Sequence, residues 1–316
     1  MNKIITFLLL FSAAHSWAFK LNVGPKSIYN LDERELISSS TESKIKELSK
    51  SVGLIFYKDD LVDINNVEKN STILSPLLTE KPPIGANYCP SEKFADHHAY
   101  KKACTGFLIA KDIVITAGHC FRSKNDCHRK AITFEATIEN EDGRGFKILN
   151  SEIYTCEKII AQEYDQSETL VDYAIIKLDR KTNRVPLKFR QAKSIEDNAA
   201  VFMIGHPLGL PKTFSSNARV LENTTDIYFK TTLDSFHGNS GSPVFNSKNF
   251  WVEGVMVRGE GDEIYNSENK CNRYATYSDA DLTKGEGVTR MSAIIPSLFN
   301  QLGDEFQSLF DDSQFP

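Results

Sequence analysis

Three short segments, far apart in the chain, carry the residue types that activate a serine hydroxyl. Ser240 lies in GNSGSP (238–243), His119 lies in TAGHC (116–120), and Asp172 begins the apolar run DYAIIKL (172–178). A serine hydroxyl is a poor nucleophile near neutral pH, so it needs a base to take its proton. An imidazole can act as that base, and a carboxylate can hold the imidazole in the useful tautomer. We therefore predict Ser240 as nucleophile, His119 as base and Asp172 as the residue that orients the base.

Small residues surround Ser240 and leave its backbone free to present N–H groups. We expect the amides of Gly238 and Ser240 to converge on a negative charge that develops on an attacked carbonyl oxygen. This arrangement is an oxyanion hole, and it supports acyl-transfer chemistry.

The order of the three residues separates two classes of serine hydrolase. In α/β-hydrolases the serine lies in G-x-S-x-G and the histidine comes last. Here Ser242 stands at the fifth position of that motif, and no histidine follows Ser240. The base must therefore precede the nucleophile, which excludes the α/β-hydrolase reading.

The first 18 residues have the layout of a secretory signal peptide, with a short basic start, an apolar centre and a small-residue end at Ala18. The apolar run is too short to indicate a membrane span. Residues 19–50 are polar and of mixed charge, so we expect a pro-segment there, with Lys50–Ser51 as a possible maturation point. These features predict a secreted or periplasmic protein that has no membrane partner after signal removal.

Composition argues against several other functions. The formal net charge of −5 gives no reason to expect nucleic acid or an anionic membrane as partner. Cys89 with His97 and His98, or Cys127 with His128, could be read as zinc ligands, but no C-x-x-C spacing supports a metal site. We expect a monomer without metal or cofactor that acts on proteins or peptides.

Six cysteines in an exported chain predict disulfides. The motif around His119 nearly gives one pair, because Cys104 and Cys120 flank the strand that delivers this histidine. Three pairings remain open for the other four cysteines, which are Cys89, Cys127, Cys156 and Cys271.

Short strand-like runs separated by turn signals predict an all-β barrel or sandwich, and residues 296–310 predict a helix with Pro296 in its first turn. The segments around Cys104, His119, Asp172 and Ser240 resemble the trypsin/chymotrypsin superfamily, and GNSGSPVFN (238–246) resembles its bacterial glutamyl-endopeptidase-like branch. The resemblance implies two six-stranded antiparallel β-barrels. We expect the first over 51–185 with His119 and Asp172, the second over 186–295 with Ser240, and a C-terminal helix and tail over 296–316.

The resemblance also implies a substrate-binding pocket. Asp234, six residues before Ser240, would lie at the pocket base and favour Arg or Lys before the scissile bond. The alternative is a structural loop carboxylate that is turned away from the pocket. Val257 and Gly259 would line the wall beside Arg258, which either points to solvent or neutralises Asp234.

Glutamyl endopeptidases use a serine, here Ser235, together with a histidine that falls on Met256 in this chain. Methionine cannot bind a carboxylate, so glutamate specificity is not expected. His237 lies near the mouth of the site and could touch substrate, whereas His206 is expected to be structural. The superfamily aspartate that pairs with a newly cut N-terminus is Asn239 here, so activation cannot use that ion pair. A catalytically silent binding protein on the same fold is the alternative to an endopeptidase.

Overall fold

The computed structural model describes residues 28–63, 71–74, 88–97, 100, 102–141, 145–165, 167, 169–191, 194–278, 280–281 and 283–311. The signal peptide expected over residues 1–18 and the first part of the expected pro-segment, 19–27, lie outside the described residues. No helix in the described part of the chain is long and apolar enough to span a membrane.

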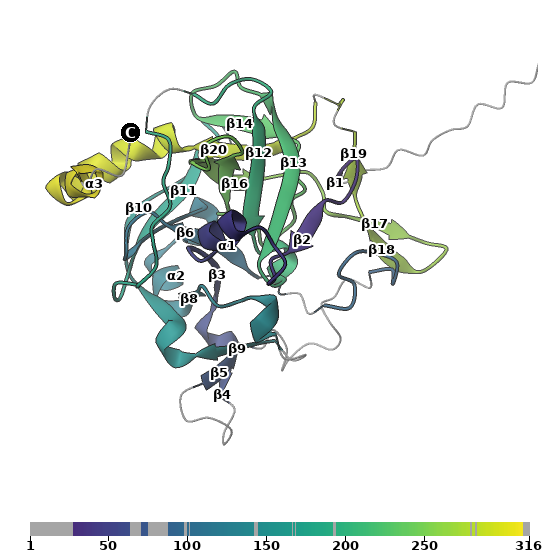
Figure 1. Ribbon diagram of the computed structural model, residues 1–316, viewed down its shortest axis with the longest axis horizontal. Helices are drawn as coiled ribbons and strands as arrows, with labels where there is room; N and C mark the ends of the chain where they lie inside the picture. The colour runs from purple at the N-terminus through teal and green to yellow at the C-terminus, as the bar shows by residue number, and fades with distance from the viewer. Residues whose placement is uncertain are drawn as a thin grey trace, which may run out of the picture.

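Six antiparallel strands close the first barrel, and the disulfide-linked strand β6 is one of them (Figure 1). Most of these strands are short and buried on both faces, which explains their nearly continuous apolar sequences. Their order around the barrel is β10 (Ile153–Tyr164), β11 (Asp172–Leu178), β7 (Ile113–Thr116), β6 (Cys104–Leu108), β3 (Val52–Tyr57) and β8 (Lys130–Thr133), and β8 pairs back onto β10.

A second set of six antiparallel strands forms the other barrel, and the pairing of β12 with β13 closes it. The predicted fold of two six-stranded antiparallel barrels is confirmed. The order is β12 (Ala200–Gly205), β15 (Pro243–Asn246), β16 (Val252–Arg258), β20 (Glu286–Arg290), β14 (Tyr228–Thr231) and β13 (Thr213–Glu222).

The N-terminal segment (residues 28–51) packs against both barrels. Its strand β1 (Ile28–Tyr29) pairs in parallel with β19 (Thr276–Tyr277), and β2 (Arg34–Leu36) adds a seventh strand to the second barrel by pairing with β13. Helix α1 (Ser43–Ser49) follows and buries Ile45 and Leu48 in the main core. Most of the expected pro-segment that the structure describes is thus a folded part of the molecule.

Smaller elements decorate the barrels. The strands β4 (Leu61–Asp63), β5 (Ser71–Leu74) and β9 (Phe146–Leu149) form a small sheet, and β17 (Glu263–Asn266) with β18 (Cys271–Tyr274) forms a hairpin that projects from the molecule (Figure 1). Helix α2 (Lys124–Arg129) begins with a capping box between Ser123 and Asp126. The 3₁₀ helices are η1 (Lys58–Asp60), η2 (Gly118–Cys120), η3 (Ile138–Asn140), η4 (Asn150–Glu152) and η5 (Pro207–Gly209).

The C-terminal helix α3 spans Met291–Asp311 and extends away from the barrels (Figure 1). The predicted start at Pro296 is wrong, because the helix begins at Met291 and holds Pro296 in its interior. Met291, Ile294 and Leu298 are completely buried, so packing on the core fixes the first turns. Gly303, with φ of 50°, interrupts the helical backbone farther along.

All six cysteines are paired. The expected Cys104–Cys120 disulfide is present, and the pairs that the sequence left open are Cys89–Cys271 and Cys127–Cys156. Cys89–Cys271 connects the segment between β5 and β6 to the β17–β18 hairpin. Cys127–Cys156 connects α2 to β10.

Candidate active site

The two barrels deliver the three predicted catalytic residues from different elements. His119 lies in η2, directly after β7, and Asp172 is the first residue of β11, the neighbouring strand. Ser240 lies in the loop that joins β14 to β15 in the second barrel. His119, Asp172 and Ser240 line one cleft of about 350 Å³.

His119 and Asp172 form a closely matched pair. The imidazole Nδ1 lies 2.7 Å from Asp172 Oδ2, and the His119 backbone N–H donates to Oδ1 at 3.1 Å. Asp172 is buried, with 3% of its surface exposed. Because an ionised carboxylate only accepts hydrogen bonds, this contact favours a proton on Nδ1, which in the neutral imidazole leaves Nε2 without one. This is the tautomer that a general base requires.

Thr105 on β6 holds the Ser240 loop against the first barrel. Its N–H donates to the Ser240 carbonyl at 2.8 Å, and its hydroxyl donates to the Gly238 carbonyl at 2.8 Å. The same hydroxyl accepts from the His206 N–H at 3.1 Å. Thr105 therefore fixes the nucleophile loop relative to the strand that is disulfide-linked to the segment carrying His119. Thr105 could not be identified from the sequence, because a threonine in a strand gives no catalytic signal.

The loop backbone at Gly238 matches the requirements of an oxyanion hole. Gly238 has a φ of 97°, and a Cβ there would lie 2.3 Å from the His206 carbonyl oxygen, so glycine is needed on both counts. Among the described residues, neither the Gly238 nor the Ser240 amide donates to another protein group. Both amides remain available for a ligand oxygen.

Most of the predicted substrate-binding residues lie in the same cleft. The cleft that contains His119, Asp172 and Ser240 is also lined by Ser235, His237, Met256, Val257 and Gly259. His237 is exposed, and its Nδ1 pairs with Asp262, which also accepts from the His237 N–H at 2.9 Å.

Asp234, the residue predicted at the pocket base, is not among the residues that line this cleft. Its two carboxylate oxygens accept from the backbone N–H groups of Tyr29 at 2.8 Å and Glu33 at 3.0 Å, and the residue is 3% exposed. It lines a separate cavity beside the N-terminal segment and does not line the catalytic cleft. Burial raises the pKa of Asp234 to about 7, although the two N–H donors act in the opposite direction. The structure therefore matches the alternative of a structural carboxylate turned from the pocket.

Arg258 is partly buried and lines the cleft, and among the described residues it forms no ion pair with Asp234. Its guanidinium donates to the carbonyl of Leu170, close to Asp172, and so connects the second barrel to the first. His206 is completely buried, its Nδ1 lies 3.0 Å from the Leu210 carbonyl oxygen, and burial lowers its pKa to about 3. This neutral imidazole supports the loop behind Gly238.

Glu286 is one of several cleft residues that could not be identified from the sequence. It is the first residue of β20, it is 2% exposed, and it lines the cleft beside Gly259 and Ser235. No local motif marks it, because its position depends on the pairing of β20 with β16.

The described residues bring one group of possible metal ligands together, namely Cys104, His119 and Cys120. The two sulfur atoms of this group are joined in a disulfide, so they are not available as thiolate ligands.

Part of the chain is similar to known peptidases. Residues 104–252 match the family model of the trypsin-like peptidase domain. Granzyme-like protein 2 of Rattus norvegicus is 33% identical over 104 residues, which are 33% of this chain and 38% of that protein. Mast cell protease 8 of Mus musculus is 34% identical over 104 residues, or 33% and 37% of the two chains. The chain thus spans less than two fifths of the length of these curated relatives.

Among solved structures, the VesB protease of Vibrio cholerae is similar in fold. The two superpose with a TM-score of 0.50 over 85% of this chain and 68% of that chain, at 13% sequence identity. The two proteins therefore have similar folds at low sequence identity.

Proposed function

Given that this chain carries a trypsin-like peptidase domain, we propose that it is a serine endopeptidase with His119, Asp172 and Ser240 as its catalytic triad. The observation that carries this proposal is the 2.7 Å contact between His119 Nδ1 and Asp172 Oδ2 in a cleft that also contains Ser240. The contact leaves Nε2 as the base on the side of the imidazole away from Asp172.

The proposed reaction has two steps, acylation of Ser240 and hydrolysis of the acyl-enzyme. Ser240 Oγ attacks the scissile carbonyl carbon while His119 Nε2 takes the hydroxyl proton, and the Gly238 and Ser240 amides stabilise the oxyanion. Collapse of this tetrahedral intermediate breaks the C–N bond, and His119 returns the proton to the leaving amine. Water then attacks the acyl-enzyme by the same route and releases the carboxylic acid and Ser240.

The substrates proposed are extended segments of proteins or peptides, cut by a secreted or periplasmic enzyme that works as a monomer without a cofactor. Residues 257–259 would pair with the substrate backbone as with an added strand. The three disulfides support an oxidising compartment. Cleavage after Arg or Lys is the preferred specificity, and cleavage after Glu or another residue is the alternative.

The test compares the secreted protein with its Ser240→Ala variant on a mixed peptide library, with cut sites identified by mass spectrometry. We expect turnover to fall by a factor of about 10⁴ or more in the variant, because the nucleophile is lost while binding and the oxyanion hole remain. Equal cleavage by both proteins would contradict the proposal. No cleavage and no covalent labelling of Ser240 by a fluorophosphonate would favour a binding protein on the protease fold.

A further inference from the structure

The base of the substrate pocket lacks the carboxylate that the family resemblance implies for it. Asp234 is held by the N–H groups of Tyr29 and Glu33, and its contacts lie in a cavity other than the catalytic cleft. A substrate side chain in the cleft therefore meets a different set of charged groups.

Glu286 is one of the charged residues that line the cleft, and its carboxyl group is buried. It lines the cleft with His119 and Ser240, and it is 2% exposed. Strand β20 runs antiparallel to β16 with Arg258 opposite Gly287, so Glu286 lies beside Gly259, the end of the cleft wall. The carboxylate is thus placed by two barrel strands and not by a mobile surface loop.

The packing at Gly259 shows that the cleft is built around this carboxylate. A Cβ at residue 259 would lie 1.9 Å from Glu286 Oε2 and 2.6 Å from its carboxyl carbon. Any side chain at 259 would therefore displace the carboxylate. At Gly261, two residues farther along the same loop, a Cβ would meet nothing within 4 Å.

Among the described residues, no cation compensates the carboxyl group of Glu286. Its carboxylate accepts from the Glu260 N–H at 3.3 Å and hydrogen-bonds to the Ser235 side chain, but no lysine or arginine pairs with it in the part of the chain that the structure describes. The neighbouring acids are already paired, Glu260 with Lys284 at 3.1 Å and Asp262 with His237. Arg258 is turned toward the Leu170 carbonyl.

A buried carboxylate without a cation is costly, and its pKa rises for that reason. A positively charged group that enters the cleft would pair with it and would be selected over neutral groups of the same shape.

We propose that Glu286 is the specificity-determining residue of this cleft and that it selects peptide substrates with Arg or Lys before the scissile bond. The proposal rests on the endopeptidase function proposed above. Glu286 would then bind the substrate Arg or Lys side chain, the role that the family resemblance implies for Asp234.

The experiment measures kcat/KM for two matched peptides that carry either arginine or its neutral isostere citrulline before the scissile bond. We expect the wild type to prefer arginine, and we expect Glu286→Gln to lower the arginine-to-citrulline ratio roughly 10- to 100-fold, the range for a hydrogen bond between charged groups. Asp234→Asn is the matched control, and we expect it to keep the wild-type ratio.

A second pair of variants tests the placement of the carboxylate. Gly259→Ala should lower the arginine-to-citrulline ratio, whereas Gly261→Ala should leave it unchanged. The intact protein offers a further measurement, in which benzamidinium should slow fluorophosphonate labelling of Ser240 and neutral benzamide should not.

The outcomes separate the two proposals. A ratio that falls in Asp234→Asn but not in Glu286→Gln, or equal effects of benzamidinium and benzamide, would overturn the role of Glu286 and leave the endopeptidase intact. Cleavage after Glu or apolar residues by the wild type would do the same. Absence of both Ser240-dependent cleavage and Ser240 labelling would overturn the endopeptidase function itself.

Discussion

At the scale of single residues, Asp172 is the member of the proposed triad that orients the base. It accepts from both the backbone and the ring of His119, so it fixes the tautomer as well as the orientation of the imidazole. An amide at this position would present an N–H group to one of those donors. The ring would then adopt the tautomer that protonates Nε2, and the base would be lost.

We therefore expect Asp172→Asn to lower kcat by about 10⁴-fold near neutral pH while the fold persists. The measurement is steady-state hydrolysis of a peptide substrate, with circular dichroism and thermal unfolding as controls for folding. Because the effect concerns the base and not binding, KM should change little. A fall in kcat of less than tenfold in a folded variant would show that the His119–Asp172 pair does not act in catalysis.

Two carboxylates show the limits of residue-level prediction. The three residues of the proposed triad stand out in the sequence because they lie in distinctive local motifs, and all three line one cleft. Asp234 and Glu286 could not be assigned from the sequence. The environment of Asp234 is set by residues about 200 positions earlier in the chain, and that of Glu286 by a strand pairing with β16.

At the scale of elements, the barrel strands were largely predictable because short apolar runs are typical of strands buried on both sides. The N-terminal segment was not, because its sequence is polar. Arg34 in β2 is completely buried, yet it pairs with Asp32 at 2.7 Å, and its guanidinium lies over Phe236 and Tyr274 at 4.0 and 4.5 Å. These partners make a buried arginine tolerable, and only the folded chain brings them together.

Lys50 and Ser51, at the end of the N-terminal segment, are held by hydrogen bonds. Ser51 is 1% exposed, its hydroxyl donates to the Val185 carbonyl at 2.6 Å, and the Lys50 carbonyl accepts from Arg184 at 2.8 Å. A protease can bind the Lys50–Ser51 bond only after these contacts open.

We expect a lysine-specific endoprotease to leave Lys50–Ser51 uncut in the native protein and to cut it in urea. The exposed Lys270, in the turn between β17 and β18, provides the reference site within the same sample. Intact-mass analysis of timed digests distinguishes the two cuts. Rapid native cleavage after Lys50, at a rate similar to that after Lys270, would instead support maturation at this bond.

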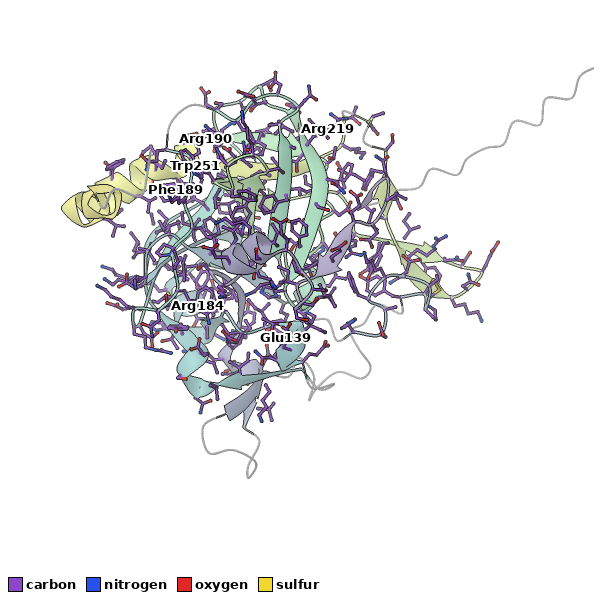
Figure 2. All side chains as sticks on the ribbon, in the orientation of Figure 1. Glu139, Arg184, Phe189, Arg190, Arg219 and Trp251 are labelled. Atoms are coloured by element: carbon purple, nitrogen blue, oxygen red, sulfur yellow. A yellow bond between two sulfur atoms is a disulfide. The ribbon has the colours of Figure 1, made fainter. Side chains whose placement is uncertain are left out.

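At the scale of the whole molecule, one lysine joins the three parts of the structure. Lys212 precedes β13 of the second barrel, and its ammonium donates to the carbonyls of Ser49 at the end of α1 (2.7 Å) and Phe134 after β8 of the first barrel (3.0 Å). Arg184 lowers its pKa, whereas Glu135 and Glu139 raise it, and Figure 2 labels Arg184 and Glu139 in its lower half. Burial is the larger effect, and the pKa of Lys212 falls to about 7.

This shift predicts how stability depends on pH. The unfolded chain keeps Lys212 protonated up to about pH 10, whereas the folded protein releases the proton near pH 7. Between these values the unfolded state binds more protons, so the contribution of Lys212 to the free energy of unfolding rises with pH. Below pH 7 both states are protonated and the contribution is constant.

Lys212→Met isolates this effect, because methionine fills a similar volume and does not titrate. We expect the free energy of unfolding of the wild type, relative to that of the variant, to increase by on the order of 1 kcal/mol per pH unit between pH 7 and 9. Urea unfolding at pH 6, 7.5 and 9 measures it. Parallel pH profiles would mean that Lys212 keeps its proton, because its two carbonyl partners outweigh burial. A rising difference would show that the contact between both barrels and the N-terminal segment is held by a neutral amine at alkaline pH.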